Sequence, residues 1–149
     1  MELKIVQYCV DFLNLSWEWF QDDELKILTD TEDFTKQDQL NWYNKLKEKN
    51  DYLIWGVVIN SRKVGACGLK NIIDSKCEYW GYIGDKAYWG KGYGKKMVQL
   101  MERKALELGC NKVTLRVIKE NLRAYNLYVS CGYQVDLDSE KYYSMFKNI

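Results

Sequence analysis

The sequence predicts a protein of the α/β (α+β) class that forms one domain over residues 1–149. The chain has 149 residues, which is the size of one domain with its own core. Two apolar or β-branched runs at 51–59 and 63–73 flank Asn60-Ser61-Arg62, a pattern typical of an antiparallel hairpin. A strand at 76–84, an amphipathic helix and a strand at 112–117 then predict a parallel crossover unit.

The residues before the hairpin predict one strand and three helical pieces. Alternating apolar residues favour a strand over Met1 to Tyr8. Helical spacing from Phe12 to Leu28 is interrupted at residues 21–23, so we expect a helix, a break and a short second piece. Thr35 and Asp38 have the spacing of a capping box. The helix they begin is expected to run to about Lys49 and to bury Leu40, Tyr43 and Leu46.

The stretch KCEYWGYIG, Lys76 to Gly84, predicts a strand with two different faces. Two glycines within it mark a bulge or a place where another group approaches the backbone closely. Alternation places Glu78, Trp80, Tyr82 and Gly84 on one face, and Cys77, Tyr79, Gly81 and Ile83 on the other.

Periodicity and capping residues predict the remaining elements. A helix over Met97 to Leu108 ends at Gly109, and Asn121 caps a second helix that Gly132 ends. Strands around 134–137 and 142–146 would complete the sheet. The side chains expected inside are Met97, Met101, Ala105 and Leu108 on the first helix, Val113, Leu115 and Val117 on the strand, and Ala124, Leu127, Tyr128 and Cys131 on the second helix.

Composition and charge exclude several classes of function. The 22 basic and 21 acidic residues give no overall field that would attract nucleic acid or an acidic membrane. The sequence has no apolar run long enough for a transmembrane helix, and its first residues lack the apolar core of a signal peptide. We therefore expect a soluble, cytoplasmic protein that binds neither nucleic acid nor membranes.

Histidine is absent, which excludes histidine-dependent triads and removes the commonest zinc ligand. The five cysteines include no C-x-x-C pair and predict free thiols in a reducing compartment. We expect no metal site.

The stretch YWGKGYGKK, Tyr88 to Lys96, predicts an anion-binding turn. Gly90, Gly92 and Gly94 let consecutive N–H groups turn toward one point, and the helix that follows adds its unpaired N–H groups and the positive end of its dipole. Phosphate suits such a site. Neither the P-loop spacing nor the G-x-G-x-x-G fingerprint is present. A turn that only connects two elements is the alternative.

Two motifs resemble the signatures of the GNAT superfamily, the acyl-CoA-dependent N-acetyltransferases. Aligned on Gly92 and Gly94, the turn matches Q/R-x-x-G-x-G/A, with Trp89 at the Gln/Arg position. The segment NLRAYNLYVSCGY, residues 121–133, matches N-x-x-A-x-x-x-Y-x-x-x-G-F except that Tyr133 replaces Phe. The resemblance covers about residues 51–133. The form Trp-Gly-Lys-Gly is similar to the branch that acetylates ribosomal-protein N-termini and to sugar-nucleotide N-acetyltransferases.

The resemblance implies the GNAT fold, a central, mixed, mostly antiparallel sheet of about six to seven strands flanked by about four helices. It implies acetyl-CoA (CoA) as the cofactor. The backbone around Ile83 and Gly84 would pair with the pantetheine, and Asn121 would hold the pantetheine arm or order water. The residues that would surround the phosphates are Trp89, Gly90, Lys91, Gly92, Tyr93, Gly94, Lys95 and Lys96.

The resemblance also implies direct transfer of the acetyl group to an amine. Tyr128 matches the tyrosine that lies near the CoA sulfur and would act as general acid. Glu78 matches an acidic position and would act as the base through water, since a chain without histidine needs a carboxylate, a tyrosine or water for this role. An N–H near Ile83 would polarise the carbonyl. The alternatives are a packed core tyrosine and an exposed glutamate paired with a lysine.

The acceptor implied is a small-molecule primary amine. Residues 34–57 are similar to sugar-nucleotide amine N-acetyltransferases, which predicts a nucleotide-linked amino-deoxy sugar. Two alternatives remain: a protein N-terminal or lysine acetyltransferase, and a non-catalytic acyl-CoA-binding regulator. We expect a monomer or a homodimer. The segment WFQDDEL resembles an acceptor-site segment of the family. It would bring Trp17, Trp19, Asp22 and Glu24 to the acceptor, unless the acids only start a helix.

Overall fold

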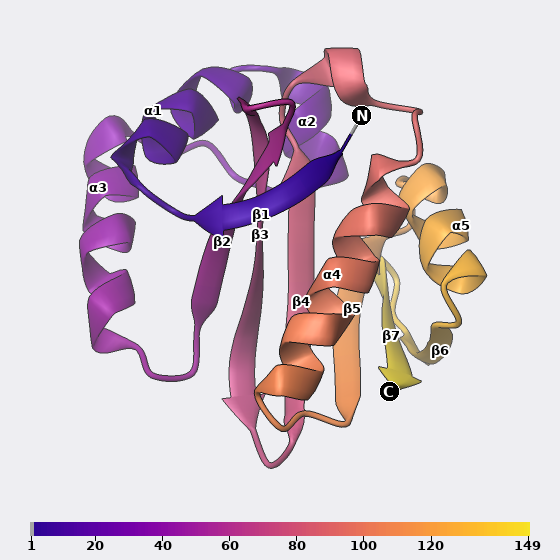
Figure 1. Cartoon of the computed structure of the whole chain (residues 1–149). Coiled ribbons are helices and arrows are strands. Elements are labelled where there is room, and N and C mark those ends of the chain that lie inside the picture. Colours follow the sequence, from indigo (N-terminus) through magenta and orange to yellow (C-terminus); the bar gives the residue numbers. More distant parts are fainter. Residues whose placement is uncertain (1) are drawn as a thin grey trace.

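The computed structural model describes residues 2–149 as a mixed sheet covered by helices on both faces (Figure 1). The sheet order is β1-β2-β3-β4-β5-β7-β6, and every neighbouring pair is antiparallel except β4 and β5. This confirms the predicted mixed, mostly antiparallel sheet. Its strands are β1 (Leu3–Gln7), β2 (Leu53–Ile59), β3 (Arg62–Ile73), β4 (Lys76–Ile83), β5 (Lys112–Ile118), β6 (Gln134–Asp138) and β7 (Tyr142–Asn148). The predicted start of the first strand, Met1, lies outside the described residues.

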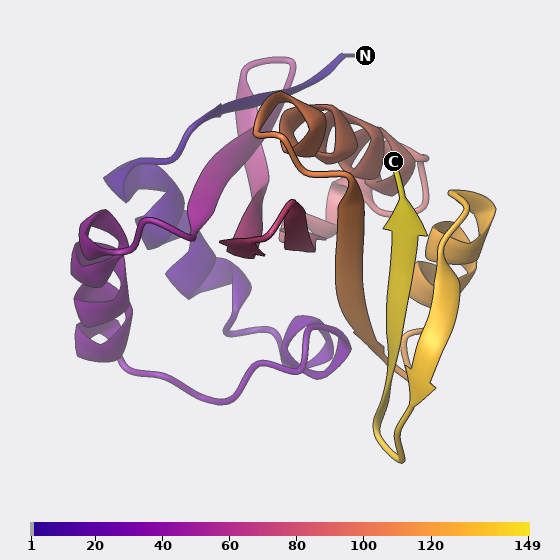
Figure 2. The same cartoon turned by 90° about the horizontal axis from the view of Figure 1, so that it is seen from below.

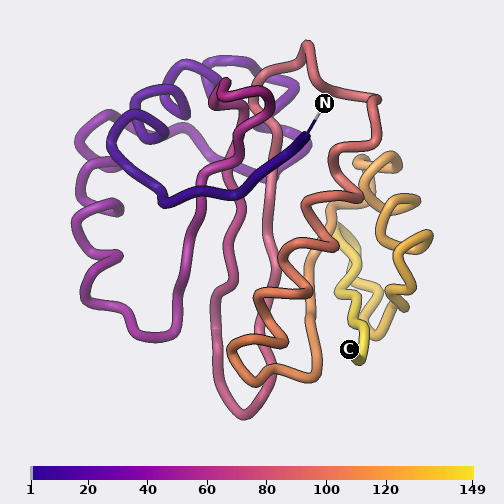
Figure 3. Tube along the Cα trace, viewed as in Figure 1, coloured from indigo at the N-terminus to yellow at the C-terminus, as the bar shows by residue number. Residues whose placement is uncertain are grey.

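Five α-helices are described within residues 2–149, against about four expected. They are α1 (Val10–Trp19), α2 (Asp23–Leu28), α3 (Lys36–Lys45), α4 (Tyr93–Glu107) and α5 (Leu122–Ser130), with short 3₁₀ turns at Leu46–Glu48 (η1) and Lys86–Tyr88 (η2). Helix α4 covers one face of the sheet, whereas the segment from α1 to α3 lies on the opposite side (Figure 2). The trace rises along β4, crosses a loop and descends along α4 (Figure 3).

A separate apolar cluster fills each face of the sheet. Met97, Met101 and Ala105 of α4 are buried, as predicted, against inward side chains of the central strands. On the other face, Phe12 of α1 packs on Gly56, where an added Cβ would lie 2.2 Å from the phenyl ring. Because only a glycine fits beneath the ring, α1 can lie directly on the sheet. The sheet is therefore the common wall of both layers.

Two predicted burial assignments and one boundary of the hairpin turn were wrong, and the helix expected to run to about Lys49 ends at Lys45. Leu40 is exposed, because Trp42 and Tyr43 supply the face of α3 that packs on the core. Leu108 is also exposed, since it follows the last turn of α4. Arg62 belongs to β3 and not to the hairpin turn.

The hairpin turn consists of Asn60 and Ser61 alone. Both have positive φ, 50° and 66°, as a two-residue type I′ turn requires. The predicted capping box at Thr35 and Asp38 is present, with both hydrogen bonds at 3.0 Å. The predicted break between α1 and α2 is confirmed.

All five cysteines are free thiols, and Cys67, Cys77 and Cys110 are buried. None of the helices described in residues 2–149 combines the length and the apolar character needed to cross a bilayer.

Candidate active site

Strands β4 and β5 separate in the middle of the sheet. They pair only over Lys76–Glu78 and Lys112–Thr114, although β4 continues to Ile83 and β5 to Ile118. A pair of parallel strands that stops after three residues leaves the rest of each facing edge without a neighbour. The two strands therefore splay apart beyond Glu78 and Thr114.

The edge of β4 that faces β5 carries the main-chain polar groups of three residues beyond Glu78, of which the Tyr79 N–H still belongs to the last β4–β5 pair. The Gly84 amide donates to the Val64 carbonyl at 2.7 Å, which fixes the pairing of β4 with β3. Hydrogen-bonded pairs alternate along an antiparallel ladder, so the N–H and C=O groups of Tyr79, Gly81 and Ile83 point away from β3. An extended ligand with amide groups can pair with such an edge as an additional strand does.

Trp89 forms a hydrogen bond with one main-chain carbonyl of this edge. Its indole Nε1 donates to the Ile83 carbonyl at 2.7 Å, and the Lys86 ammonium lies 5.4 Å from the Trp89 ring centroid. The residue at the Gln/Arg position of the glycine motif thus fixes the end of β4. A carbonyl that already accepts from an indole is less available to a ligand, which leaves the Ile83 N–H as the free group at this position.

Helix α4 begins four residues earlier than predicted. Its N-cap is Gly92, whose φ of 84° suits glycine, and Tyr93 is the first helical residue. Tyr93, Gly94, Lys95 and Lys96 therefore form the first turn of the helix and are not part of a loop. The first turn contains no acidic residue. Its unpaired N–H groups and the positive end of the helix dipole are suited to an anion, which is the role that the glycine pattern predicts.

The predicted phosphate-binding residues do not all lie together. A cavity lies at the start of α4, and Lys95 lines it. Lys91 and Lys96 do not line this cavity, and the Lys91 ammonium lies 5.9 Å from the centroid of the Tyr88 ring. Gly84 is also outside it, because a Cβ there would lie 2.3 Å from the Trp19 ring. Gly84 thus serves close packing of α1 on β4.

Two cavities meet at the gap between β4 and β5. The first, of about 630 Å³, lies between α2, β4, the start of α4 and the start of α5, and we call it the glycine-turn cavity. The second, of about 640 Å³, lies between α1, α3, the loop after α2, β4 and β5, and we call it the aromatic cavity. Residues that line both are Leu28, Thr29, Tyr79, Gly81, Tyr82, Asn121, Ala124 and Tyr128.

Tyr128 lies at this junction on α5. Its ring packs against Tyr79 and Tyr133, with centroids 6.3 and 6.1 Å away. Burial raises the pKa of Tyr128 to about 12, because the phenolate would lose the solvation it has in water. The hydroxyl is therefore a neutral hydrogen-bond donor at physiological pH.

Asn121 has a structural role at the same junction. Its Oδ1 accepts from the Ala124 amide at 3.2 Å and so caps α5, as predicted. Its Nδ2 donates to the Leu28 carbonyl at 3.1 Å. Both ends of the amide are thus engaged, and the side chain joins α5 to α2 across the mouth of the glycine-turn cavity.

Glu78 lines the aromatic cavity at the last residue of β4 that pairs with β5. Its Oε2 lies 3.6 Å from the Lys70 ammonium, and Asn71 Nδ2 donates to its Oε1 at 3.2 Å. The pairing with a lysine foreseen as the alternative role is therefore present. These two contacts hold the carboxylate at the wall of the cavity.

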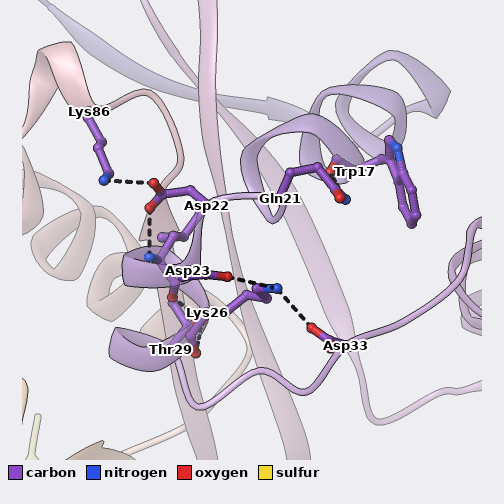
Figure 4. Close-up of polar contacts among 9 residues, drawn as sticks. Trp17, Gln21, Asp22, Asp23, Lys26, Thr29, Asp33 and Lys86 are labelled. Atoms are coloured by element: carbon purple, nitrogen blue, oxygen red, sulfur yellow. Dashed lines mark hydrogen bonds and ion pairs between the residues drawn. The ribbon is translucent and has the colours of Figure 1, made fainter.

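The segment expected to meet the acceptor instead joins α2 to the β4–α4 loop. Asp22 caps α2 by accepting from the Leu25 amide at 2.9 Å, and its other oxygen accepts from Lys86 at 2.9 Å (Figure 4). Glu24 lies 2.8 Å from the same ammonium. Neither Asp22 nor Glu24 lines the aromatic cavity. Helix-start acids were the alternative prediction, and these contacts agree with it.

Trp17 and Trp19 also lie outside the aromatic cavity. Trp17 packs against Phe34 and Trp19 against Tyr82, at centroid distances of 5.7 and 6.2 Å. Both rings support the cavity wall from behind.

Several residues of the site were not found from the sequence. The aromatic lining of the second cavity includes Tyr8, Phe20, Phe34, Trp42, Tyr52, Trp80, Tyr82 and Tyr142. Strand alternation already placed Trp80 and Tyr82 on the face of Glu78, but no local signal brings α3 or β7 to the same cavity. Trp80 lies flat over Gly68, where a Cβ would be 2.5 Å from its Nε1. Lys86 and Arg116 also carried no sequence signal.

Comparison with known proteins identifies a family. A sequence model of the acetyltransferase (GNAT) family matches residues 10–133. A probable spermine N(1)-acetyltransferase of Bacillus subtilis subsp. natto is 37% identical over 62 residues, which are 38% of this chain and 41% of that protein. An uncharacterized protein of Methanocaldococcus jannaschii is 25% identical over 100 residues, 67% of this chain and 19% of that protein. The chain thus spans less than half the length of either relative.

Solved structures share the fold over nearly the whole chain. A domain from Methanocaldococcus jannaschii has a TM-score of 0.88 at 20% identity and covers 99% of both chains. The spermidine N-acetyltransferase of Vibrio cholerae, in complex with CoA and spermine, has a TM-score of 0.87 at 18% identity and covers 98% of this chain and 95% of that one. The N-acetyltransferase PseH of Campylobacter jejuni, in complex with acetyl coenzyme A, has a TM-score of 0.78 at 18% identity and covers 99% of both chains.

Proposed function

The chain belongs to the acetyltransferase (GNAT) family, and we propose that it transfers an acetyl group from acetyl-CoA to the amine of a nucleotide-linked amino-deoxy sugar. The observation that carries this proposal is the meeting of two cavities at Tyr128, beside the free edge of β4. One cavity ends at an anion-binding helix start and the other is lined by aromatic side chains. Two substrates can therefore reach the same point from opposite sides of the gap.

The residues of the glycine-turn cavity fit acetyl-CoA. The unpaired N–H groups at the start of α4 suit its pyrophosphate, and Lys95 adds a positive charge. The edge groups of Tyr79, Gly81 and Ile83 suit amides of an extended arm. The bound carrier would supply an acetyl thioester near Tyr128.

The chain's own groups then account for the proton movements. The acceptor ammonium must lose a proton to become a neutral, nucleophilic amine, and Glu78 would take that proton through a water molecule in the aromatic cavity. The edge N–H of Ile83 would donate to the carbonyl oxygen as negative charge develops there. Tyr128 would donate to the leaving sulfur. Overall, a C–N bond forms and the C–S bond breaks, and of the two protons that the ammonium nitrogen loses, one leaves through Glu78 and the other ends on the thiol.

The raised pKa of Tyr128 defines its part in this scheme. A simple thiol has a pKa of about 8.5, so a phenol of pKa about 12 is the weaker acid. Tyr128 would therefore stabilise the thiolate by hydrogen bonding, and outright proton donation would cost more.

The character of the aromatic cavity supports a sugar nucleotide as the acceptor. Its aromatic faces suit stacking on a base or a sugar ring. Two of its three acidic residues have cation partners, because Glu78 pairs with Lys70 and Asp30 lies 2.8 Å from Lys141, while Asp38 caps α3. A polyamine carries several positive charges and would need several uncompensated carboxylates, whereas Asp38 alone lacks a cation partner among the acids of the lining, which gives the neutral or anionic acceptor the better fit.

A polyamine is nevertheless the second candidate, because two of the similar proteins are named for spermine or spermidine acetylation. The protein N-terminal or lysine acetyltransferase and the non-catalytic acyl-CoA-binding regulator are further alternatives. A regulator would bind CoA, show no turnover and be insensitive to loss of the Tyr128 hydroxyl.

The experiment offers purified protein acetyl-CoA together with a UDP-linked amino-deoxy sugar, spermine or a peptide, and measures release of CoA. We expect turnover with the sugar nucleotide at least tenfold faster than with the other two amines. Faster turnover with spermine or peptide would reassign the acceptor. Tight CoA binding without turnover on any amine would contradict the proposed activity.

A further inference from the structure

We propose that Arg116 forms an anion-recognition subsite in the aromatic cavity and binds a phosphate group of the acceptor. The inference rests on the acetyl transfer proposed above and names the contact that would select a phosphate-bearing amine. It follows from the position of Arg116, from the charges around it and from the contact that holds it.

Arg116 lies on the wall of the aromatic cavity that β5 provides. The last paired residues of the two parallel strands are Glu78 and Thr114, so a continued ladder would place Trp80 opposite Arg116. The strands separate instead, and both side chains line the cavity. A guanidinium from β5 and an indole from β4 therefore line the same cavity.

Arg116 is a cation in the cavity lining that has no ion-pair partner among the described residues. Of the other charged residues in the lining, Lys70 pairs with Glu78 and Asp30 pairs with Lys141, whereas the Asp38 carboxylate caps α3. Arg116 takes part in none of the ion pairs found among residues 2–149. The cavity therefore has one positive charge without a partner, which an anionic ligand would neutralise.

An aromatic contact holds the guanidinium in place. Its Cζ lies 4.0 Å from the centroid of the Tyr142 ring on β7. Stacking uses the face of a guanidinium and leaves its N–H edge free to donate two parallel hydrogen bonds to a phosphate. Holding the side chain in advance lowers the entropy that binding must overcome.

Lys112 provides a matched control on the same strand. It lies on the same face, four residues before Arg116, and its ammonium lies 4.9 Å from the Phe146 ring centroid. It takes part in none of the ion pairs among the described residues, and it does not line the aromatic cavity. Neutralising Lys112 changes the charge of the protein equally but leaves the proposed subsite intact.

The test compares Arg116→Gln with Lys112→Gln in steady-state kinetics. With a UDP-linked amino-deoxy sugar, Arg116→Gln should raise the acceptor KM roughly 10- to 100-fold, as expected for loss of a charged hydrogen bond. The kcat and the KM for acetyl-CoA should change less than about twofold. Lys112→Gln should leave all three values unchanged. With the free amino sugar, which carries no phosphate, the two variants should match the wild type.

A binding measurement separates this inference from the acetyl transfer itself. UDP is titrated calorimetrically onto protein saturated with CoA, and we expect binding by the wild type and Lys112→Gln but not by Arg116→Gln. Arg116 is exposed, so the variant should fold, and its melting temperature checks this. Arg116→Lys, which keeps the charge but loses the fork, should give intermediate affinity.

Three outcomes would overturn the subsite: equal KM changes in the two Gln variants, no KM change in Arg116→Gln, or undiminished UDP binding by that variant. If the enzyme acetylates amino sugars but Arg116→Gln and Lys112→Gln do not differ in acceptor KM or UDP binding, the acetyl transfer stands and only the subsite is refuted. Absence of turnover with every amine, while UDP binding still depends on Arg116, would instead contradict the transfer.

Discussion

Replacing Tyr128 by phenylalanine removes one oxygen atom at the junction of the two cavities and keeps the ring. The contacts of that ring with Tyr79 and Tyr133 are therefore retained. The start of α4 and the free edge of β4, which would hold the cofactor, are untouched. We expect the variant to lose turnover while it binds CoA with the affinity of the wild type.

The size of the loss follows from the pKa of the hydroxyl. Complete proton transfer from a phenol of pKa about 12 to a thiolate of pKa about 8.5 would cost roughly 5 kcal/mol, so Tyr128 acts through a hydrogen bond. A hydrogen bond to a charged group contributes about 1.5–3 kcal/mol. Loss of that stabilisation in the transition state lowers kcat by roughly 10- to 150-fold.

Tyr133→Phe is the matched control. Its hydroxyl belongs to the same aromatic group but donates to Glu102 at 3.0 Å and lines neither cavity. It should keep the wild-type kcat and lose some stability. The assay measures kcat with saturating acetyl-CoA and the dissociation constant of CoA by calorimetry. An unchanged kcat in Tyr128→Phe, or equal losses of kcat and CoA affinity, would remove Tyr128 from the chemistry.

Tyr128→Phe also changes the stability of the protein at high pH. The folded-state pKa of Tyr128 is raised above the value of about 10 in the unfolded chain. The stability that comes from burying the neutral hydroxyl is therefore fully present below about pH 10. The contribution is lost as pH rises through about 12, and it amounts to roughly 3 kcal/mol. Denaturant unfolding between these pH values should show a shallower pH dependence for Tyr128→Phe. Identical slopes for variant and wild type would contradict the burial of the hydroxyl.

Three further predictions concern the cofactor site, the base and the fold. Gly92→Glu should abolish CoA binding in calorimetry, because the new carboxylate would occupy the anion site. Gly109 has the same φ of 84° but lies outside the glycine-turn cavity, so Gly109→Glu should still bind CoA. Glu78→Gln keeps the contact with Asn71 but cannot take a proton, so kcat should fall roughly 10²- to 10⁴-fold. A kcat close to wild type would leave Glu78 as a lysine partner only. Thr35→Ala removes a hydrogen bond of the capping box and should lower the free energy of unfolding by about 1 kcal/mol, with unchanged kcat; an unaltered denaturation midpoint would refute this.

The sequence alone determined the order and type of the elements. Local signals sufficed wherever a few neighbouring residues decide the structure, as with the capping box at Thr35 and the helix cap at Asn121. The glycine pattern around Gly92 likewise encodes its own backbone geometry, because positive φ strains any residue with a Cβ. These local features predict an anion-binding turn from the residues alone, before a family resemblance implies which cofactor binds there.

The tertiary structure decided which side chains share a cavity. Arg116 on β5, Trp42 on α3 and Tyr142 on β7 line the same space although no local pattern connects them. It also paired Asp22 with Lys86, 64 residues away, and placed Asp22 outside the lining of the aromatic cavity. Capping and strand alternation act within a few residues of chain, whereas a cavity forms where packed layers fail to meet. Its lining therefore depends on the placement of every element around it.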